Sequence, residues 1–294
     1  MLNLAGSQVA ESEAAIAAVC LATDQPFGLR IDRGAEAWIG PRGDGLTKQA
    51  DWLVLDSDPC PEYTAWISRL ESTGRKIWLE VVSEDEAECA IALGAAAIIL
   101  KGHDGGGRVG DETTFVLSQR IPRLLGRLDG RSSELLVQGG IGLHSAGACF
   151  LAGADGIVLD SQLLLARESR VSGELRNFLG TLDGSESLVS GSGTRVTTPP
   201  KGTLAEPGLE RDLPLGPDAA AAKGLAQRFV TVSGIVQAYC HHVNLAFRSA
   251  MDDPPLRSES PWCLEHGTRY PIAQGPMTRV SDTAEFAVAV ADAG

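Results

Sequence analysis

Short apolar runs alternate with segments of helical periodicity over the first 168 residues. Near-continuous apolar runs are expected for parallel strands that are buried on both faces. Seven such runs predict strands, at Leu2–Leu4, Phe27–Ile31, Trp52–Leu55, Ile77–Val82, Ala97–Leu100, Leu135–Val137 and Ile157–Leu159. The segments between most of them predict helices, at Glu11–Leu21, Glu62–Ser72, Glu84–Leu93, Thr113–Leu128 and Ser145–Leu151. This alternation predicts a parallel sheet with right-handed crossovers.

Seven strands are one short of the eight that close a (β/α)8 barrel. Because Leu2–Leu4 has no strand before it, we expect an α/β TIM barrel that is incomplete at its N-terminus and lacks strand 1. The stretch Asp32–Asp51 holds the weakest helical pattern, because Pro41 and several glycines interrupt it. Ser83 and Glu86 have the spacing of a capping box at a helix start.

The chain changes character after residue 183. Residues 184–216 are rich in Ser, Gly, Thr and Pro, which predicts a linker. Residues 217–268 predict a helical connecting segment, whose main helical zone breaks near Gly224 or Gly234.

Residues 269–294 have the pattern of one isolated β/α unit. They predict a strand at Tyr270–Ala273, a Gly-Pro turn, and a helix capped by Ser281 or Asp282.

Composition narrows the class of protein. The 294 residues carry a net charge of −13 with a pI of about 4.8, which argues against nucleic-acid binding. No apolar run approaches the roughly 20 residues that cross a bilayer, so we expect no membrane partner. The N-terminus lacks the features of a signal peptide. The six cysteines form no CxxC pair, which predicts reduced thiols in a cytoplasmic protein without a metal site.

Residues 134–162 carry the strongest functional signal. One apolar run ends in Gly139–Gly140, and the next ends in Asp160–Ser161. Glycines at strand ends let bare backbone N–H groups approach an anion, and barrels of this type hold phosphate in their last two loops. We therefore expect a phosphorylated cofactor. The alternative is that these glycines only allow tight packing between strand and helix.

Longer motifs resemble one family. AAAIILKGHDGGGRVGDETTFVLSQ and LLVQGGIGLHSAGACFLAGADGIVLDSQL resemble the nitronate monooxygenase (2-nitropropane dioxygenase-like) flavin barrels. The likeness is greatest to versions within bacterial polyketide or polyunsaturated fatty acid synthases. YPIAQGPMTRVSD resembles the first strand and turn of the same family. The resemblance implies a TIM barrel that binds FMN, formed by residues 1–183, and the start of a second barrel at 269–294.

The resemblance also implies which residues bind FMN. Gly139 and Gly140 would give N–H groups to the phosphate, and the end of strand 8 would contact the phosphate or the ribityl chain. The glycine loop, LKGHDGGGRVG at residues 100–110, would lie beside the isoalloxazine. If the C-terminal β/α unit fills the vacant strand-1 position, its Gln-Gly-Pro-Met turn would lie under the flavin. The implied residues are Gly105, Gly106, Gly107, Gln138, Gly139, Gly140, Gly156, Leu159, Asp160, Ser161, Gln274, Gly275 and Met277.

The sequence departs from the family at the catalytic base. Arg108 stands where nitronate-oxidising relatives carry histidine, and an arginine stays protonated at neutral pH. Arg108 and Lys101 could instead stabilise substrate or flavin charge, with His103 as a proton donor. The alternatives are that Arg108 is a solvated charge and that Lys101 only pairs with a carboxylate.

The resemblance implies an FMN-dependent oxidoreductase module of a polyketide-type synthase, which reduces an enoyl or acyl thioester with NADPH as electron donor. Its partners would be a small-molecule or carrier-bound acyl substrate and other domains of the megasynthase. Two alternatives stay open. One is nitronate monooxygenase activity on nitroalkanes with FMN and O2, and the other is a non-catalytic scaffold that docks acyl-carrier domains.

Overall fold

The computed structural model describes residues 1–32, 49–56, 61–72, 74–125, 133–200, 212–275, 279 and 281–293. The chain divides into two compact units, Met1–Cys240 and His241–Gly294, and each is described by itself. Within the described ranges, no helix has the length and apolar character that crossing a bilayer requires.

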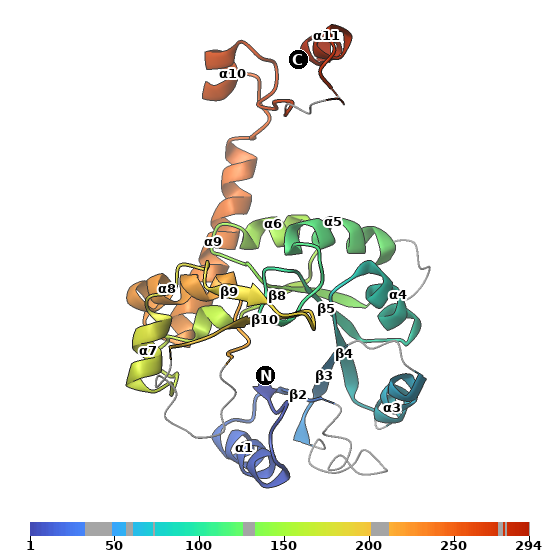
Figure 1. Cartoon of the computed structure of the whole chain (residues 1–294), viewed down its shortest axis with the longest axis vertical. Coiled ribbons are helices and arrows are strands. Elements are labelled where there is room, and N and C mark those ends of the chain that lie inside the picture. Colours follow the sequence, from blue (N-terminus) through green and yellow to red (C-terminus); the bar gives the residue numbers. More distant parts are fainter. Residues whose placement is uncertain are drawn as a thin grey trace. The chain divides into compact units, whose positions relative to one another are not determined.

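A seven-stranded sheet forms the centre of the first unit (Figure 1). All of its neighbouring strands are parallel, in the order β1-β2-β3-β4-β5-β7-β8. The strands are β1 Leu2–Asn3, β2 Gly28–Arg30, β3 Trp52–Asp56, β4 Lys76–Val81, β5 Ala97–Lys101, β7 Glu134–Gln138 and β8 Gly156–Val158. All seven predicted strands are therefore confirmed. Within the described chain β1 and β8 do not pair with each other, so the TIM-like sheet is open.

The central strands are buried on both faces, as their unbroken apolar runs predicted. Leu53, Val54 and Leu55 of β3 are fully buried, and so are all five residues of β5. Five helices follow the strands along the outer side of the sheet (Figure 1). They are α1 Val9–Ala22, α3 Pro61–Glu71, α4 Glu84–Ala92, α5 Thr114–Leu125 and α6 Ala146–Leu151. The weak helical pattern in Asp32–Asp51 falls mostly on residues 33–48, outside the described residues.

The start of α4 shows half of the predicted capping box. The Ser83 hydroxyl accepts a hydrogen bond from the Glu86 N–H at 3.2 Å. The Glu86 carboxylate accepts from the N–H of Val82 at 3.0 Å rather than from that of Ser83. The reason is that both oxygens of Glu86 also bind Arg108, which holds its side chain away from the position that a closed box needs.

A small antiparallel sheet includes part of the loop that follows β5. Its strands are β6 Gly107–Arg108, β9 Ser187–Val189 and β10 Thr194–Thr197, in the order β6-β10-β9 (Figure 1). Part of the stretch 184–216 is thus a sheet rather than the expected linker. The pairing partner of β10 lies far away in the sequence, at Arg108, so local composition carried no sign of it.

Helical segments after β8 extend the first unit to Cys240, past residue 183, where the sequence suggested a boundary. A cluster of Leu165, Leu179, Leu182, Leu215, Ala219 and Ala222 joins three of these segments. The segments are η3 Ser161–Leu163, α7 Gly173–Leu179, η4 Pro217–Ala220, α8 Ala221–Phe229 and α9 Val232–Asp252. The predicted helical zone after Pro217 is present, but its break falls at Val230, with φ of 65°, and not at Gly224 or Gly234.

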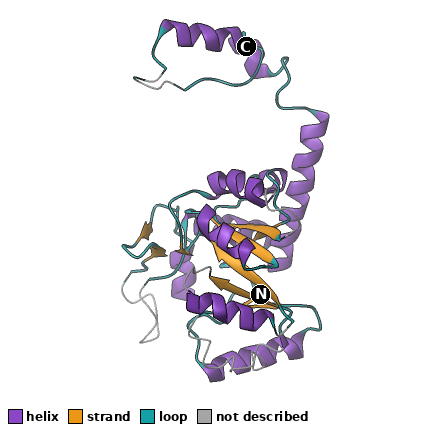
Figure 2. Ribbon diagram, turned by 90° about the vertical axis from the view of Figure 1, so that its right-hand side faces the viewer, coloured by secondary structure: helices purple, strands orange, loops and turns teal. Residues whose placement is uncertain are grey.

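The second unit contains α10 Pro261–His266 and α11 Ala284–Ala293 (Figure 2). The predicted strand at Tyr270–Ala273 is wrong, because no described residue there is in a strand. A single extended segment needs a paired neighbour to form a stable strand. The predicted final helix is present. Its cap is Thr283, whose hydroxyl accepts a hydrogen bond from the Phe286 N–H, rather than Ser281 or Asp282. That residues 269–294 begin a second barrel stays a prediction.

Candidate functional site

Polar side chains gather where the parallel strands end. Arg30, Asp56, Lys101 and Gln138 are the last residues of β2, β3, β5 and β7. Pairing sets Asp56 beside Glu80 of β4, and Lys101 beside Gln138. Since the carboxyl ends of parallel strands share one edge, this edge is where such folds place ligands.

Glu80 is the centre of a buried ion-pair network at this edge. Its carboxylate lies 3.0 Å from Lys101 Nζ and 3.5 Å from Arg30 Nη2. Arg30 in turn binds Asp56 at 2.7 Å. Burial alone would raise the pKa of Glu80, but the nearby cations Lys101 and Arg30 outweigh burial and lower it. Glu80 is therefore an ionised counter-charge, and Lys101 forms the carboxylate pair that was the alternative to a catalytic role.

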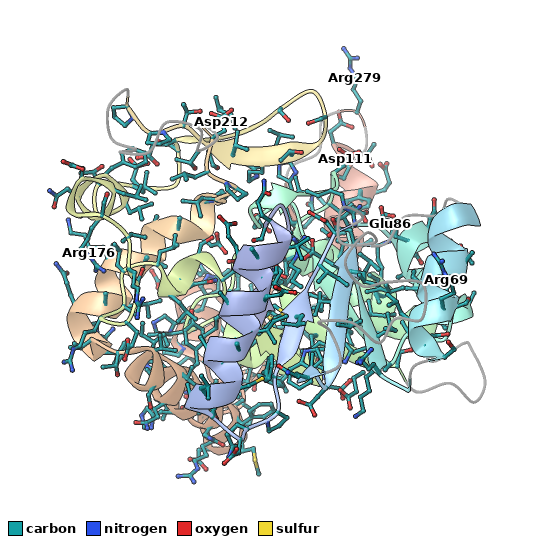
Figure 3. All side chains as sticks on the ribbon, turned by 90° about the horizontal axis from the view of Figure 1, so that it is seen from below. Arg69, Glu86, Asp111, Arg176, Asp212 and Arg279 are labelled. Carbon is teal, nitrogen blue, oxygen red and sulfur yellow. The ribbon has the colours of Figure 1, made fainter. Side chains whose placement is uncertain are left out.

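Arg108 is fixed from two directions. Its Nη1 and Nη2 donate to the two oxygens of Glu86 at 2.7 and 3.1 Å, and Nη2 also donates to the Glu80 backbone oxygen at 3.1 Å. Figure 3 shows Glu86 extending from α4. Burial is the largest single influence on the pKa of Arg108 and lowers it, but the Glu86 hydrogen bond and the surrounding carboxylates together outweigh burial and raise the pKa of the guanidinium. Arg108 is thus an anchored cation and cannot serve as a base.

The glycine loop packs directly against the Gly139–Gly140 turn. Both turn residues adopt positive φ, 94° and 66°. A Cβ on Gly139 would lie 2.8 Å from the Gly105 nitrogen, and one on Gly106 would lie 2.1 Å from the Pro214 oxygen. These glycines therefore allow three chain segments to meet, which is the packing alternative noted above. Packing does not exclude ligand binding, since positive φ also turns backbone N–H groups outward.

His103 is held at the base of the glycine loop. Its Nδ1 lies 2.9 Å from the Gly110 carbonyl oxygen, which can only accept, so Nδ1 carries the hydrogen. The His103 backbone oxygen accepts from Nε of the buried Arg195 in β10 at 2.8 Å. Arg195 also donates to the Ser187 hydroxyl at 3.0 Å, which joins the small sheet to the loop.

The ends of β7 and β8 meet as predicted. Gln138 Nε2 donates to the Asp160 carboxylate at 3.1 Å, and the buried Ser161 begins η3 directly afterwards. Leu159 connects β8 to this end. Gly156 is not brought to the edge, because it starts β8 and pairs with Leu136, two residues before the end of β7.

An acid absent from the sequence prediction lies beside this turn. Asp218 of η4 accepts from Gln162 Nε2 at 3.3 Å. Burial, and next the Asp160 carboxylate, raise its pKa to about 6, whereas the Ser161 hydroxyl and the Gly140 N–H act to lower it. Neither of those donors reaches hydrogen-bond geometry. Within the described chain, Ser161 Oγ and Asp218 Oδ1 are both buried without a hydrogen-bond partner.

The remaining predicted site residues lie in the other unit. Gln274 and Gly275 are exposed there, and Met277 is outside the described residues. Among the residues that the structure describes, no group of three or more His, Cys, Asp or Glu side chains could hold a metal ion.

A parallel, helix-covered sheet that gathers polar groups at its strand ends defines the TIM-barrel-like α/β class.

No family model matches the chain. Two curated proteins, both called (3aS,4S,5R,7aS)-5-hydroxy-7a-methyl-1-oxo-octahydro-1H-indene-4-carboxyl-CoA dehydrogenase, are similar. That of Mycobacterium tuberculosis is 30% identical over 165 residues, 55% of this chain and 44% of the relative. That of Rhodococcus jostii is 28% identical over 168 residues, which cover 57% of this chain and 45% of the relative. The chain spans less than half the length of these curated relatives.

Solved structures show the same fold at low identity. FabK from Thermotoga maritima matches with a TM-score of 0.67 at 21% identity, over 84% of this chain and 85% of that chain. The enoyl reductase domain of MlnA, from the macrolactin biosynthesis cluster of Bacillus amyloliquefaciens, gives 0.63 at 13% identity, over 84% and 89%. A nitroalkane oxidase from Streptomyces ansochromogenes gives 0.57 at 18% identity, over 85% and 89%. These likenesses establish the fold of the chain.

We expect Glu80→Gln to lower the free energy of unfolding by about 3–5 kcal/mol, because it leaves Lys101 and Arg30 without their shared counter-charge. Glu84→Gln is the matched control, since Glu84 pairs with Arg120 at the surface and its loss should cost at most about 1 kcal/mol. Urea denaturation measures both. Equal losses in the two variants would contradict the central role of Glu80.

We expect Asp218 to make stability depend on pH. Folded Asp218 keeps its proton up to a pH of about 6, whereas an ordinary aspartate loses it near 3.8. The folded state therefore binds more protons in this window, and its stability falls as the pH rises from about 4 to about 6. The unfolding free energy of the wild type should fall relative to that of Asp218→Asn by at most about 3 kcal/mol. Parallel stability profiles from urea titrations at pH 4 to 7 would show that the proton is not held there.

Proposed function

We propose that the chain is an FMN-dependent oxidoreductase that reduces an enoyl or acyl thioester. The observation that carries the proposal is the convergence of the Gly139–Gly140 turn and Ser161 at the ends of neighbouring strands β7 and β8. The shared fold with FabK and with the MlnA enoyl reductase domain supports it. So do the names of the curated relatives, which describe dehydrogenases of a carboxyl-CoA compound.

The donors at the turn fit the phosphate of FMN. The hydroxyl of Ser161 is buried without a hydrogen-bond partner in the described chain, and such a group is costly unless a ligand supplies the acceptor. The left-handed Gly140 can present its N–H beside it. Asp218 fits beside the phosphate only when it is protonated, because two neighbouring anions would otherwise repel each other.

The chemistry that FMN would supply when bound is hydride transfer, with NADPH as the donor and the β-carbon of the thioester's double bond as the acceptor. The proton for the α-carbon would come from His103. With Nδ1 donating to Gly110, Nε2 is the ring nitrogen from which the proton would be given to a substrate. The Glu80 network and Arg108 would fix the charge around the reaction without taking part in proton transfer.

A nitronate monooxygenase role is less well supported. That chemistry needs a base to remove a proton from a nitroalkane, and the corresponding position is Arg108. The guanidinium of Arg108 is paired with Glu86, and its pKa is raised above the ordinary value. The likeness to the nitroalkane oxidase fold does not supply a base.

We further propose that the acyl group arrives on a carrier domain of a polyketide-type synthase. The MlnA domain, which belongs to the macrolactin biosynthesis cluster, has the same fold, and the motifs of this chain resemble the synthase-embedded versions. Under this proposal the chain works in the cytoplasm beside other domains of the megasynthase. An acyl-CoA is the competing form of the substrate, because the names of the curated relatives refer to a carboxyl-CoA.

The test is the flavin spectrum of the purified chain. After reconstitution we expect FMN to stay bound, to be bleached by NADPH without air, and to regain its colour when an enoyl thioester is added. Offering the same enoyl group on CoA and on a carrier protein separates the two forms of substrate. Oxygen uptake with a nitroalkane would favour the monooxygenase instead. A chain that binds no FMN would favour the scaffold.

We expect Ser161→Ala to weaken FMN binding about tenfold, since one hydroxyl donor to a charged group contributes roughly 1.5 kcal/mol. Its stability should hardly change, because Ser161 Oγ has no partner within the described protein. Ser12→Ala is the matched control, as Ser12 is also buried with an unpartnered hydroxyl, but on α1. Fluorescence titration with FMN gives the affinities. Equal affinities in the two variants would remove Ser161 from the phosphate site.

A further inference from the structure

Asp218 reaches the turn because its segment is fastened on both sides. Residue Gly216 lies so close to the glycine loop that a Cβ would come within 2.6 Å of the Asp104 backbone oxygen. Leu213 pairs with Thr197 of β10, and Leu215 and Ala219 are buried in the leucine cluster. The carboxylate of Asp218 is therefore held beside the turn by packing that does not involve the carboxylate itself.

The surroundings of Asp218 disfavour its charge. Gln162 Nε2 at 3.3 Å is its one hydrogen-bond donor in the described chain, and the other carboxylate oxygen is buried without a partner. The acid facing it is Asp160, at the end of β8. From α9, Tyr239 faces it, and burial together with the charge of Asp218 raises the pKa of that phenol to about 12. Asp104 of the glycine loop lies next to Gly140.

We propose that the Asp218 carboxylate, which lies beside the Gly139–Gly140 turn, repels the FMN phosphate there, so that the cofactor binds together with one proton on Asp218. The inference rests on the proposed function, since it takes the flavin phosphate as the ligand of this turn. The physical reason is that two adjacent anions repel each other, and the nearby Asp160 carboxylate adds to the repulsion. Protonation removes one of the charges.

The proposal predicts how FMN affinity changes with pH. Asp218, with a pKa of about 6, is about 1% protonated at pH 8 and half protonated at pH 6. Asp218→Asn mimics the protonated acid at every pH. It should therefore bind FMN about 100-fold more tightly than the wild type at pH 8, and about twofold more tightly at pH 6.

Three comparisons isolate the effect. The phosphate of FMN has its own second pKa near 6, and the ratio of variant to wild type cancels it. Riboflavin, which lacks the phosphate, should bind both proteins equally. Asp212→Asn removes an exposed acid six residues earlier, labelled in Figure 3, and should leave FMN affinity unchanged. Asp218→Ala provides a second variant in case the asparagine disturbs folding, and it should show a gain at pH 8 as well.

The experiment is fluorescence titration of the full-length chain with FMN and with riboflavin from pH 5.5 to 8. A gain for FMN alone, largest at pH 8, supports the proposal. Equal FMN affinity of the wild type and both Asp218 variants at pH 8 overturns the proposal and leaves the proposed function standing. A gain in riboflavin affinity equal to the gain in FMN affinity has the same meaning.

If no protein binds either flavin, the proposed function fails, and inorganic phosphate replaces FMN as the probe. Phosphate that raises the melting temperature of Asp218→Asn more than that of the wild type at pH 8 then supports repulsion at the turn. The absence of such a difference overturns it.

Discussion

Glu80 is the constraint on which the strand-end edge depends. Its buried carboxylate neutralises Lys101 on one side and Arg30 on the other, and its backbone oxygen receives Arg108. A buried pair adds little net stability, but an unpaired buried charge is very costly. The ends of β2, β4 and β5 must therefore keep their relative positions, and the loop that carries Arg108 is fixed by the same residue. The geometry of the candidate site follows from this charge balance more than from any single hydrophobic contact.

The elements of the barrel could be predicted because their signals are local. A strand such as Ala97–Lys101 is an apolar run buried on both faces, and the start of a helix such as α4 is marked by the cap residue Ser83. The same local reasoning located the Gly139–Gly140 turn, since glycine at a strand end is visible in the sequence. It also failed where local pattern is insufficient. Residues Tyr270–Ala273 look like a strand, yet none of the described residues of their unit forms a strand with which they could pair.

The missed residues of the site depend on contacts between distant parts of the chain. Arg30 and Glu80 did carry a signal, because each is a charge inside an otherwise apolar run and so had to find a buried counter-charge. Arg195 and Asp218 carried none. They lie in segments of loop and helix composition, and they meet His103 and Gln162 only after the chain has folded back across the barrel edge.

The late position of these residues affects how the site is assembled in the cell. Chains fold from the N-terminus as the ribosome makes them. The seven parallel strands end at Val158, so the Gly140 amide emerges well before the η4 segment that brings Asp218 to it. In a nascent chain the Gly139–Gly140 turn would therefore be open to an anion while Asp218 was still inside the exit tunnel. The order in which the ribosome synthesises these segments would then decide which anion the turn meets first.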